Sequence, residues 1–202
     1  MPSMSEAAKI RDVAARHAYV FDNGLCSPDF FDVEKRMQSE EFCLLRDRIF
    51  SDESVLEIGC FTGLNLMGLR RYGRSGQFTG IEFVRSATMW MLERDATIGV
   101  IHGEFPTHRP SNCTYDNVVC FDVLEHQLNV GEFLKVANSV LRPTGRALFL
   151  VPLGKEYNDC GHVAWFPDAE CLRNVLEYFF NVDQVFELKS SKKMFASCSR
   201  LR

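Results

Sequence analysis

The sequence predicts an α/β protein whose sheet is doubly wound and mostly parallel. From residue 54 to residue 179, segments typical of strands alternate with segments typical of helices, which is the pattern of βαβ units. The run 116–121 is almost continuously apolar, as expected of a strand buried on both faces. The last two strand-like segments, 181–188 and 192–199, are joined by a short polar turn, which predicts an antiparallel pair. In such a fold, ligands bind at the carboxyl ends of the strands.

Length and composition indicate one ordinary globular domain. The chain has 202 residues, of which 46% are hydrophobic and 25% charged. The formal net charge of −4 argues against nucleic acid as the main partner, because phosphate binding needs clustered Lys and Arg. No apolar run approaches the roughly 20 residues that span a bilayer, and the N-terminus lacks the apolar region of a signal peptide. We therefore expect a cytoplasmic protein without nucleic-acid or membrane partners. The sequence does not indicate its oligomeric state.

The eight cysteines are scattered and include no C-x-x-C pair, so their spacing gives no metal signature. Several lie in apolar runs, as Cys120 does, where a free thiol behaves as a small hydrophobic group. We expect reduced, buried thiols, which agrees with a cytoplasmic location.

The N-terminal quarter of the chain is predicted to be helical. Residues 5–18 form a weakly amphipathic pattern, and a break over 23–28 follows. Pro28 suits the first position of a second helix that runs to about residue 50. Because no change of composition marks a linker, we expect residues 1–50 to form a helical cap packed on a main domain of residues 51–202.

The main domain should then alternate strands and helices. Asn129 is a predicted N-cap with Glu132 three residues later, and Pro143 and Gly145 are expected to end that helix. Pro167 should begin the last helix. The predicted strands before the final pair are 54–58, 77–82, 98–102, 116–121 and 146–151, and the predicted helices are 64–72, 85–95, 129–141 and one starting at 167.

A glycine-bracketed turn follows the first strand of the main domain. Gly59 and Gly63 allow positive φ angles and let a ligand approach where a side chain would collide. The turn opens a helix, whose N-terminus favours electron-rich groups. Glu57, at the end of the strand, needs a polar partner beside the core. Together these features predict a ligand that has both cationic and hydroxyl groups.

Glu82 ends the second strand about 20 residues beyond Gly63, where an acid in a nucleotide-binding α/β fold can hold ribose hydroxyls. A nicotinamide dinucleotide is the weaker interpretation, because the spacing is G-x-x-x-G rather than G-x-G-x-x-G. The sequence therefore favours a ribose-bearing ligand without a pyrophosphate.

Residues 50–200 resemble the class I S-adenosylmethionine-dependent methyltransferases. The resemblance implies a Rossmann-like, three-layer αβα fold with seven strands, the last of them antiparallel, and S-adenosylmethionine as the cofactor, which becomes S-adenosylhomocysteine. Five segments carry it, in the same order and at similar spacing: Val55-Leu-Glu-Ile-Gly-Cys-Phe-Thr-Gly63, Gly80-Ile-Glu82, Gly103-Glu104-Phe105-Pro106, Tyr115-Asp-Asn-Val-Val-Cys-Phe-Asp-Val-Leu-Glu-His126 and Leu141-Arg-Pro-Thr-Gly145.

The resemblance also implies the cofactor contacts. Glu57 would help to hold the ammonium of the methionine portion, and Glu104 and Phe105 would hold the adenine. The chain departs from the family at Phe61, where a third glycine is usual. Its side chain must point away from the cofactor or narrow the pocket. The cofactor-binding residues expected in this way are Glu57, Gly59, Cys60, Gly63, Glu82, Phe83, Glu104, Phe105, Asp122 and Val123.

Methyl transfer from a sulfonium needs mainly alignment and exclusion of water, with a base only if the acceptor must lose a proton. His126 lies after the fourth strand of the main domain, and we expect it to be a base, a wall of the site or a structural residue. His162 and Trp165 are expected to line the acceptor site. Asp122, Glu125, His126 and His162 form an oxygen- and nitrogen-rich set that suggests a divalent ion, but the sequence places His162 only loosely. We therefore expect no metal.

The predicted activity is methyl transfer to an oxygen or nitrogen of a small molecule. The residues 1–50 and the loop 152–166 would close the acceptor pocket. A protein that keeps the fold and binds the cofactor as a non-catalytic partner subunit is the alternative, and Phe61 favours it.

Overall fold

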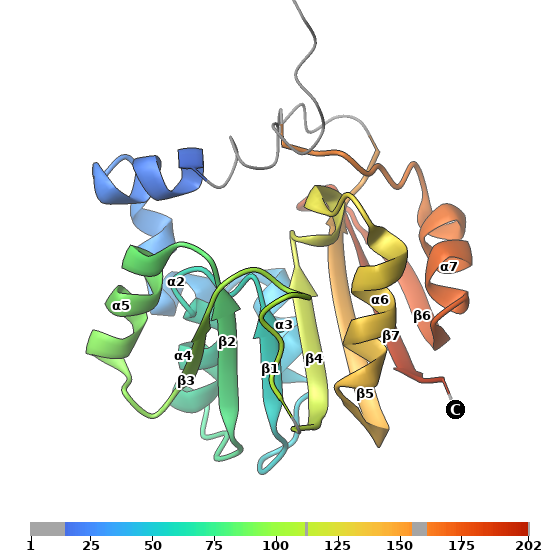
Figure 1. Ribbon diagram of the computed structural model, residues 1–202, viewed down its shortest axis with the longest axis horizontal. Coiled ribbons are helices and arrows are strands. Elements are labelled where there is room, and N and C mark those ends of the chain that lie inside the picture. Colours follow the sequence, from blue (N-terminus) through green and yellow to red (C-terminus); the bar gives the residue numbers. More distant parts are fainter. Residues whose placement is uncertain (1–14, 112, 155–160, 202) are drawn as a thin grey trace, which may run out of the picture.

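The computed structural model describes residues 15–111, 113–154 and 161–201, and these form one seven-stranded sheet with helices on both faces (Figure 1). The order of the strands is β3-β2-β1-β4-β5-β7-β6. The strands are β1 (Val55–Ile58), β2 (Phe78–Glu82), β3 (Gly99–His102), β4 (Tyr115–Phe121), β5 (Leu141–Pro152), β6 (Phe180–Leu188) and β7 (Lys193–Arg200).

The first five strands are parallel, and β7 runs antiparallel to both of its neighbours. Strand β1 pairs with β2 and with β4 in parallel register, whereas β5 and β6 each pair with β7 in antiparallel register. The predicted doubly wound sheet with an antiparallel last strand is therefore confirmed. Because β1 lies in the middle of the parallel part, its carboxyl end lies at the edge where such sheets bind ligands.

Two apolar clusters fill the spaces between the sheet and its helices. Alternate residues of β4 point to opposite clusters, Val118 into one and Val119 into the other, so both faces of this strand are buried as predicted. One cluster is covered by α6 (Val130–Ser139) and α7 (Ala169–Glu177), and the other by α2 (Val33–Met37), α3 (Glu40–Arg46), α4 (Leu64–Arg71) and α5 (Arg85–Arg94).

The prediction of one helix over 28–50 is wrong. The segment forms a short 3₁₀ helix, η1 (Pro28–Phe31), and the separate helices α2 and α3. Asp32 accepts a hydrogen bond from the amide of Lys35, and Ser39 accepts one from the amide of Phe42. Each side chain caps a new helix, and the chain changes direction there. A further helix covers residues 15–22, whereas most of the predicted helix 5–18 lies outside the described residues.

Two boundaries in the main domain also differ from the prediction. Asn129 caps α6 as expected, but the helix already ends at Ser139. Pro143 and Gly145 lie in β5, which starts at Leu141 because Leu141 pairs with Tyr115 before a register shift. The last helix starts after Asp168, which caps it, rather than at Pro167.

No helix among the described residues is both long and apolar enough to cross a bilayer. The seven cysteines in the described part of the chain are free thiols, and Cys160 lies outside it.

Candidate functional site

Glu57 lies at the carboxyl end of β1 and is 4% exposed. One of its carboxylate oxygens accepts a hydrogen bond from Asn65 Nδ2 at 2.5 Å, and Arg36 Nε donates to Asn65 Oδ1 at 2.7 Å. Burial raises the pKa of Glu57 to about 7, and the nearby charge of Glu82 also raises it, while Asn65 and Arg36 oppose the shift. The second oxygen, Oε2, is buried and has no hydrogen-bond partner among the described residues. This acid is thus suited to a cationic ligand.

Glu82 lies at the carboxyl end of β2, next to β1, and is also 4% exposed. Its two oxygens accept hydrogen bonds from the amides of Phe61, at 2.9 Å, and Val84, at 2.8 Å. Burial raises the pKa of Glu82 against the opposing effect of these amides. Because a carboxylate offers about four acceptor positions, both oxygens keep capacity for hydroxyl donors.

The turn between β1 and α4 requires its two glycines. Gly59 and Gly63 have φ angles of 69° and 68°. A Cβ atom on Gly59 would come within 2.3 Å of Val123 Cγ2, and one on Gly63 within 1.9 Å of Met91 Sδ. The glycines therefore permit close packing of the turn against the loop after β4 and against α5. Cys60 between them is a buried thiol whose pKa is raised well above its ordinary value by burial.

Phe61 lies in the same turn, with a φ angle of 47°, and its ring contacts the N-terminal segment. The ring packs edge-to-face against Phe21 at 5.5 Å and Phe30 at 5.4 Å between centroids. Phe31 joins this group through Phe21. The residue that departs from the family pattern thus attaches the N-terminal segment to the glycine turn. Thr62 adds a hydrogen bond to the carbonyl of Phe30 at 2.7 Å.

Asp122 and Val123 follow β4 at the same edge of the sheet. Asp122 has a φ angle of 56°, and its Oδ2 accepts from Lys193 Nζ at 2.5 Å. Its Oδ1 is buried and lacks a hydrogen-bond partner in the described part of the chain. Since Val123 packs on Gly59, the structure brings these two predicted cofactor residues next to the glycine turn.

The residues predicted to hold adenine differ in exposure. Glu104 is exposed, whereas Phe105 is buried, with its ring 5.0 Å from that of Phe133 on α6. Phe105 therefore belongs to the core as well as to this loop. Phe83, after β2, is 36% exposed, and its ring stacks on that of His17 at 6.4 Å.

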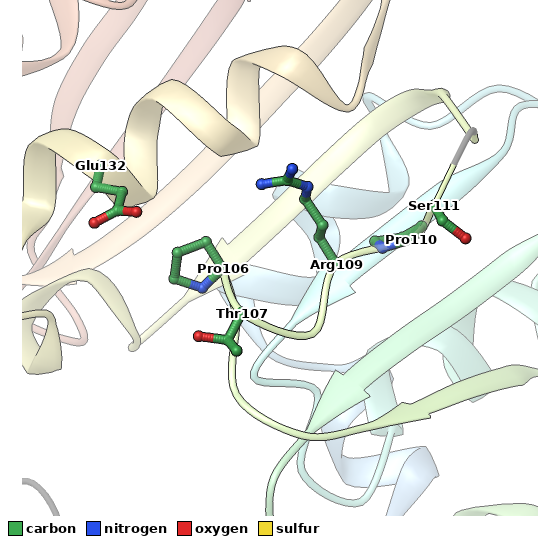
Figure 2. A pocket seen from close by; sticks show the side chains of 6 residues that line it. All are labelled: Pro106, Thr107, Arg109, Pro110, Ser111 and Glu132. Atoms are coloured by element: carbon green, nitrogen blue, oxygen red, sulfur yellow. The ribbon is translucent and has the colours of Figure 1, made fainter.

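A hollow of about 490 Å³ lies beside this loop. Figure 2 shows Arg109 extending from the loop and Glu132 projecting from α6. The residues that line the hollow are Pro106, Thr107, Arg109, Pro110, Ser111 and Glu132, none of which was expected to bind the cofactor.

His126 and His162 come together although 35 residues separate them, with ring centroids 4.8 Å apart. His126 ends the 3₁₀ helix η2 (Leu124–His126), and its Nδ1 lies 3.0 Å from the carbonyl oxygen of Gly161. Neither histidine is fully buried, and Trp165 is 48% exposed. The expected acceptor-side residues are therefore at one edge of the sheet, while 155–160 of the predicted closing loop lie outside the described residues.

Several residues at this edge were not expected from the sequence. The ring of His17 lies 6.4 Å from those of both Phe83 and His126, so the N-terminal segment reaches the cofactor side and the acceptor side. Asn65 donates to Glu57, Arg36 donates to Asn65, and Lys193 donates to Asp122. No local motif marks these residues, and Arg36 and Lys193 lie 29 and 71 residues from their partners in sequence.

The comparisons with known proteins agree with this arrangement. Residues 33–192 match the family model described as a methyltransferase domain. The match covers most of the chain, so this protein belongs to the methyltransferase domain family. Its fold is that of the class I S-adenosylmethionine-dependent methyltransferases, as its motifs indicated.

The curated relatives of this chain are distant from it in sequence. The ubiquinone biosynthesis O-methyltransferase of Serratia proteamaculans is 27% identical over 101 residues, which are 48% of this chain and 42% of that protein. The chain thus matches less than half the length of this curated relative.

Two solved structures share the fold. The Burkholderia thailandensis 1,6-didemethyltoxoflavin-N1-methyltransferase has a TM-score of 0.75 at 14% identity, covering 100% of this chain and 93% of that one. A putative methyltransferase in complex with the Haloferax volcanii Trm112 activator has a TM-score of 0.74 at 12% identity, covering 94% and 97%.

Proposed function

We propose that this protein transfers the methyl group of S-adenosylmethionine to an oxygen or nitrogen of a small molecule. The observation that carries the proposal is the pair of buried acids, Glu57 and Glu82, at the carboxyl ends of neighbouring strands on either side of the glycine turn. One acid suits an ammonium and the other suits ribose hydroxyls, and the turn lacks the spacing that cradles a pyrophosphate.

The donor set fits the cofactor. The buried Oε2 of Glu57 needs a donor, and the ammonium of the methionine portion would supply one. Glu82 would accept from the two ribose hydroxyls, and the glycine turn would let the cofactor approach the backbone. Glu104 and Phe105 would lie at the adenine, and Cys60, Phe83, Asp122 and Val123 would line the remaining surface. The bound cofactor would supply an electrophilic methyl group.

On the acceptor side, His126 would either receive a proton from the acceptor or line the site. When Nδ1–H donates to the carbonyl of Gly161, Nε2 carries the lone pair. His162 and Trp165 would line the acceptor, and the N-terminal segment and the loop 152–166 would exclude water. Similarity to a ubiquinone biosynthesis O-methyltransferase and to a 1,6-didemethyltoxoflavin-N1-methyltransferase supports a small-molecule acceptor. We place this activity in the cytoplasm and expect no nucleic-acid partner.

The alternative function is a methyltransferase-like partner subunit that binds the cofactor without catalysis. The observation behind this alternative is the fold similarity to a putative methyltransferase in complex with the Trm112 activator. However, Phe61, the sequence feature that favoured it, contacts Phe21 and Phe30, which gives this residue a structural role.

Isothermal titration with S-adenosylmethionine and S-adenosylhomocysteine tests cofactor binding. We expect micromolar affinity for the wild type and a loss of at least about 100-fold for Glu82→Ala, because two hydrogen bonds to a charged acceptor contribute about 1.5–3 kcal/mol each. Glu177→Ala, which removes a surface acid on α7, is the control and should bind like the wild type. An enzyme of this class is ruled out if the wild type binds neither ligand.

Catalysis is tested with His126→Ala and a panel of hydroxylated and amino acceptors. A general base contributes about 100-fold or more, so kcat should fall by that factor while the affinity for S-adenosylhomocysteine stays unchanged. A wild type that binds the cofactor but methylates none of the acceptors would favour the partner-subunit alternative.

A further inference from the structure

Glu125, His126 and His162 form a compact set of metal-ligating groups on the acceptor side. One ligand atom from each residue lies within 4.8 Å of the other two. Glu125 is only 2% exposed, and the two histidines are partly exposed. One carboxylate and two imidazoles are ligand types that divalent transition-metal ions take in proteins.

The backbone holds the two parts of this cluster together. The amides of Val163 and Ala164 both donate to the carbonyl oxygen of Glu125, at 2.8 and 3.0 Å. His126 Nδ1 lies 3.0 Å from the carbonyl oxygen of Gly161, the residue before His162. Three contacts therefore join the segments 124–126 and 161–164, and they flank the ligating groups. These contacts fix the relative positions of the two segments without any bound ion.

The contact of His126 with Gly161 also determines which nitrogen can bind a metal. A carbonyl oxygen only accepts, so Nδ1 must carry the proton and Nε2 keeps its lone pair. Metal-binding histidines commonly donate their other N–H to a backbone carbonyl, which orients the ring and increases its basicity. The structure thus supplies both a ligand and its supporting contact.

We propose that Glu125, His126 and His162 bind a divalent first-row transition-metal ion of the Zn²⁺ or Co²⁺ type. Two imidazoles and one carboxylate favour such ions over Mg²⁺ or Ca²⁺, which prefer oxygen ligands alone. Bond lengths of about 2.1 Å place tetrahedral ligand atoms about 3.4 Å apart, so the widest pair closes by about 1.4 Å at most on binding. Three protein ligands leave positions open for the acceptor, as in catalytic zinc sites.

Asp122 is close in sequence but does not belong to this set. Its Oδ2 is held by Lys193 at 2.5 Å, which directs the carboxylate toward β7. The sequence suggested four ligating residues and the structure assembles three, so the assignment depends on tertiary placement rather than on the sequence pattern.

A catalytic role for the ion rests on the proposed methyltransferase function. Such a role favours acceptors that carry a hydroxyl group. The ion would bind the acceptor oxygen and lower the pKa of its hydroxyl, so that the proton leaves to water. The oxygen lone pair then forms the O–CH₃ bond as the C–S bond breaks, and the sulfonium becomes a neutral thioether. The oxidation state of the ion does not change, and Nε2 of His126 is a ligand in this scheme rather than the base.

Cobalt titration of the 202-residue chain, freed of metal with a chelator, tests the site directly. We expect one Co²⁺ per chain with a visible ligand-field spectrum, displaced by Zn²⁺. Glu125→Gln and His162→Gln should each weaken binding by at least about 100-fold, because even loss of a residue that only supports a ligand costs about 10–100-fold. His108→Gln, an exposed histidine outside the cluster, is the matched control and should not change the titration.

The affinity for S-adenosylhomocysteine, measured on each variant, reports whether the fold is retained. The proposal is overturned if the wild-type titration matches that of His162→Gln, or if Zn²⁺ raises the Tm of Glu125→Gln as much as that of the wild type. A wild type that binds Co²⁺ but not S-adenosylhomocysteine would support the metal site and contradict the proposed function.

Discussion

At the level of single residues, Glu57 combines burial with a charge that the candidate cofactor would match. Its hydrogen bond from Asn65 stabilises the ionised form, but burial is the larger effect and favours the protonated form near neutral pH. A cationic ligand would reverse this balance by pairing with the carboxylate. The residue therefore links the pH dependence of stability with the binding of the methionine portion of the cofactor.

The stability of the free protein should fall as the pH rises through the range in which Glu57 ionises. The unfolded chain releases this proton near pH 4.5, whereas the folded chain keeps it until about pH 7. Between these values the folded state binds more protons, so the free energy of unfolding decreases with rising pH. Between pH 5 and 8 the wild type should lose about 2–3 kcal/mol more than Glu57→Gln.

Urea unfolding of both proteins at pH 5 and pH 8 measures this difference. Glu82 is present in both proteins, so the part of its raised pKa that is due to burial cancels in the comparison. If the free energy of unfolding changed equally with pH in the wild type and in Glu57→Gln, the pKa of Glu57 would not be raised and this prediction would be wrong.

At the level of elements, the turn between β1 and α4 joins three parts of the chain. Gly59 packs on the loop after β4, Gly63 packs on α5, and Phe61 holds the N-terminal segment through Phe21 and Phe30. Cofactor binding at this turn would therefore be coupled to the position of the segment that covers it.

Replacing Phe61 with alanine should loosen the N-terminal segment. The two ring contacts contribute about 0.5–1.5 kcal/mol each, so the free energy of unfolding should fall by about 1–3 kcal/mol. Limited proteolysis should then cut residues 15–31 faster than in the wild type. Tyr178→Ala, which removes an aromatic side chain that is 81% exposed, is the control. Equal cleavage rates in Phe61→Ala and the wild type would contradict this role.

The helices of the N-terminal region show which element boundaries local sequence patterns can predict. The periodicity over 28–50 predicted one helix, but capping side chains at Asp32 and Ser39 divide it. Both are good N-cap residues, so a closer reading of cap positions would have found these boundaries. The early start of β5 had no such local signal, because it depends on the pairing of Leu141 with Tyr115.

At the level of the whole molecule, the sheet and its two apolar clusters form a scaffold whose ligand edge joins β1, β2 and β4 (Figure 1). A ligand that binds this edge contacts strands and loops from most of the chain. Its binding free energy should therefore appear as stability of the entire fold.

S-adenosylhomocysteine at 100 times its Kd should raise the Tm by about 5–11 °C. Binding at this ratio contributes about 2.7 kcal/mol, and each kcal/mol shifts the Tm of a domain of this size by about 2–4 °C. Differential scanning fluorimetry measures the shift, and NADH at the same concentration is the control ligand. An equal shift with NADH would favour a dinucleotide site instead.

The sequence by itself determined the order of the strands and helices, the antiparallel end of the sheet, the glycine turn and the acids that end β1 and β2. These features follow from hydrophobic periodicity and turn chemistry within short windows. Tertiary structure alone decided the pairing of Glu57 with Asn65 and of Asn65 with Arg36, the attachment of Lys193 to Asp122, and the cluster of Glu125, His126 and His162. Arg36 and Asn65 are 29 residues apart on α2 and α4, and Asp122 and Lys193 are 71 residues apart, so these partners meet only after the helices and β7 have packed on the parallel strands.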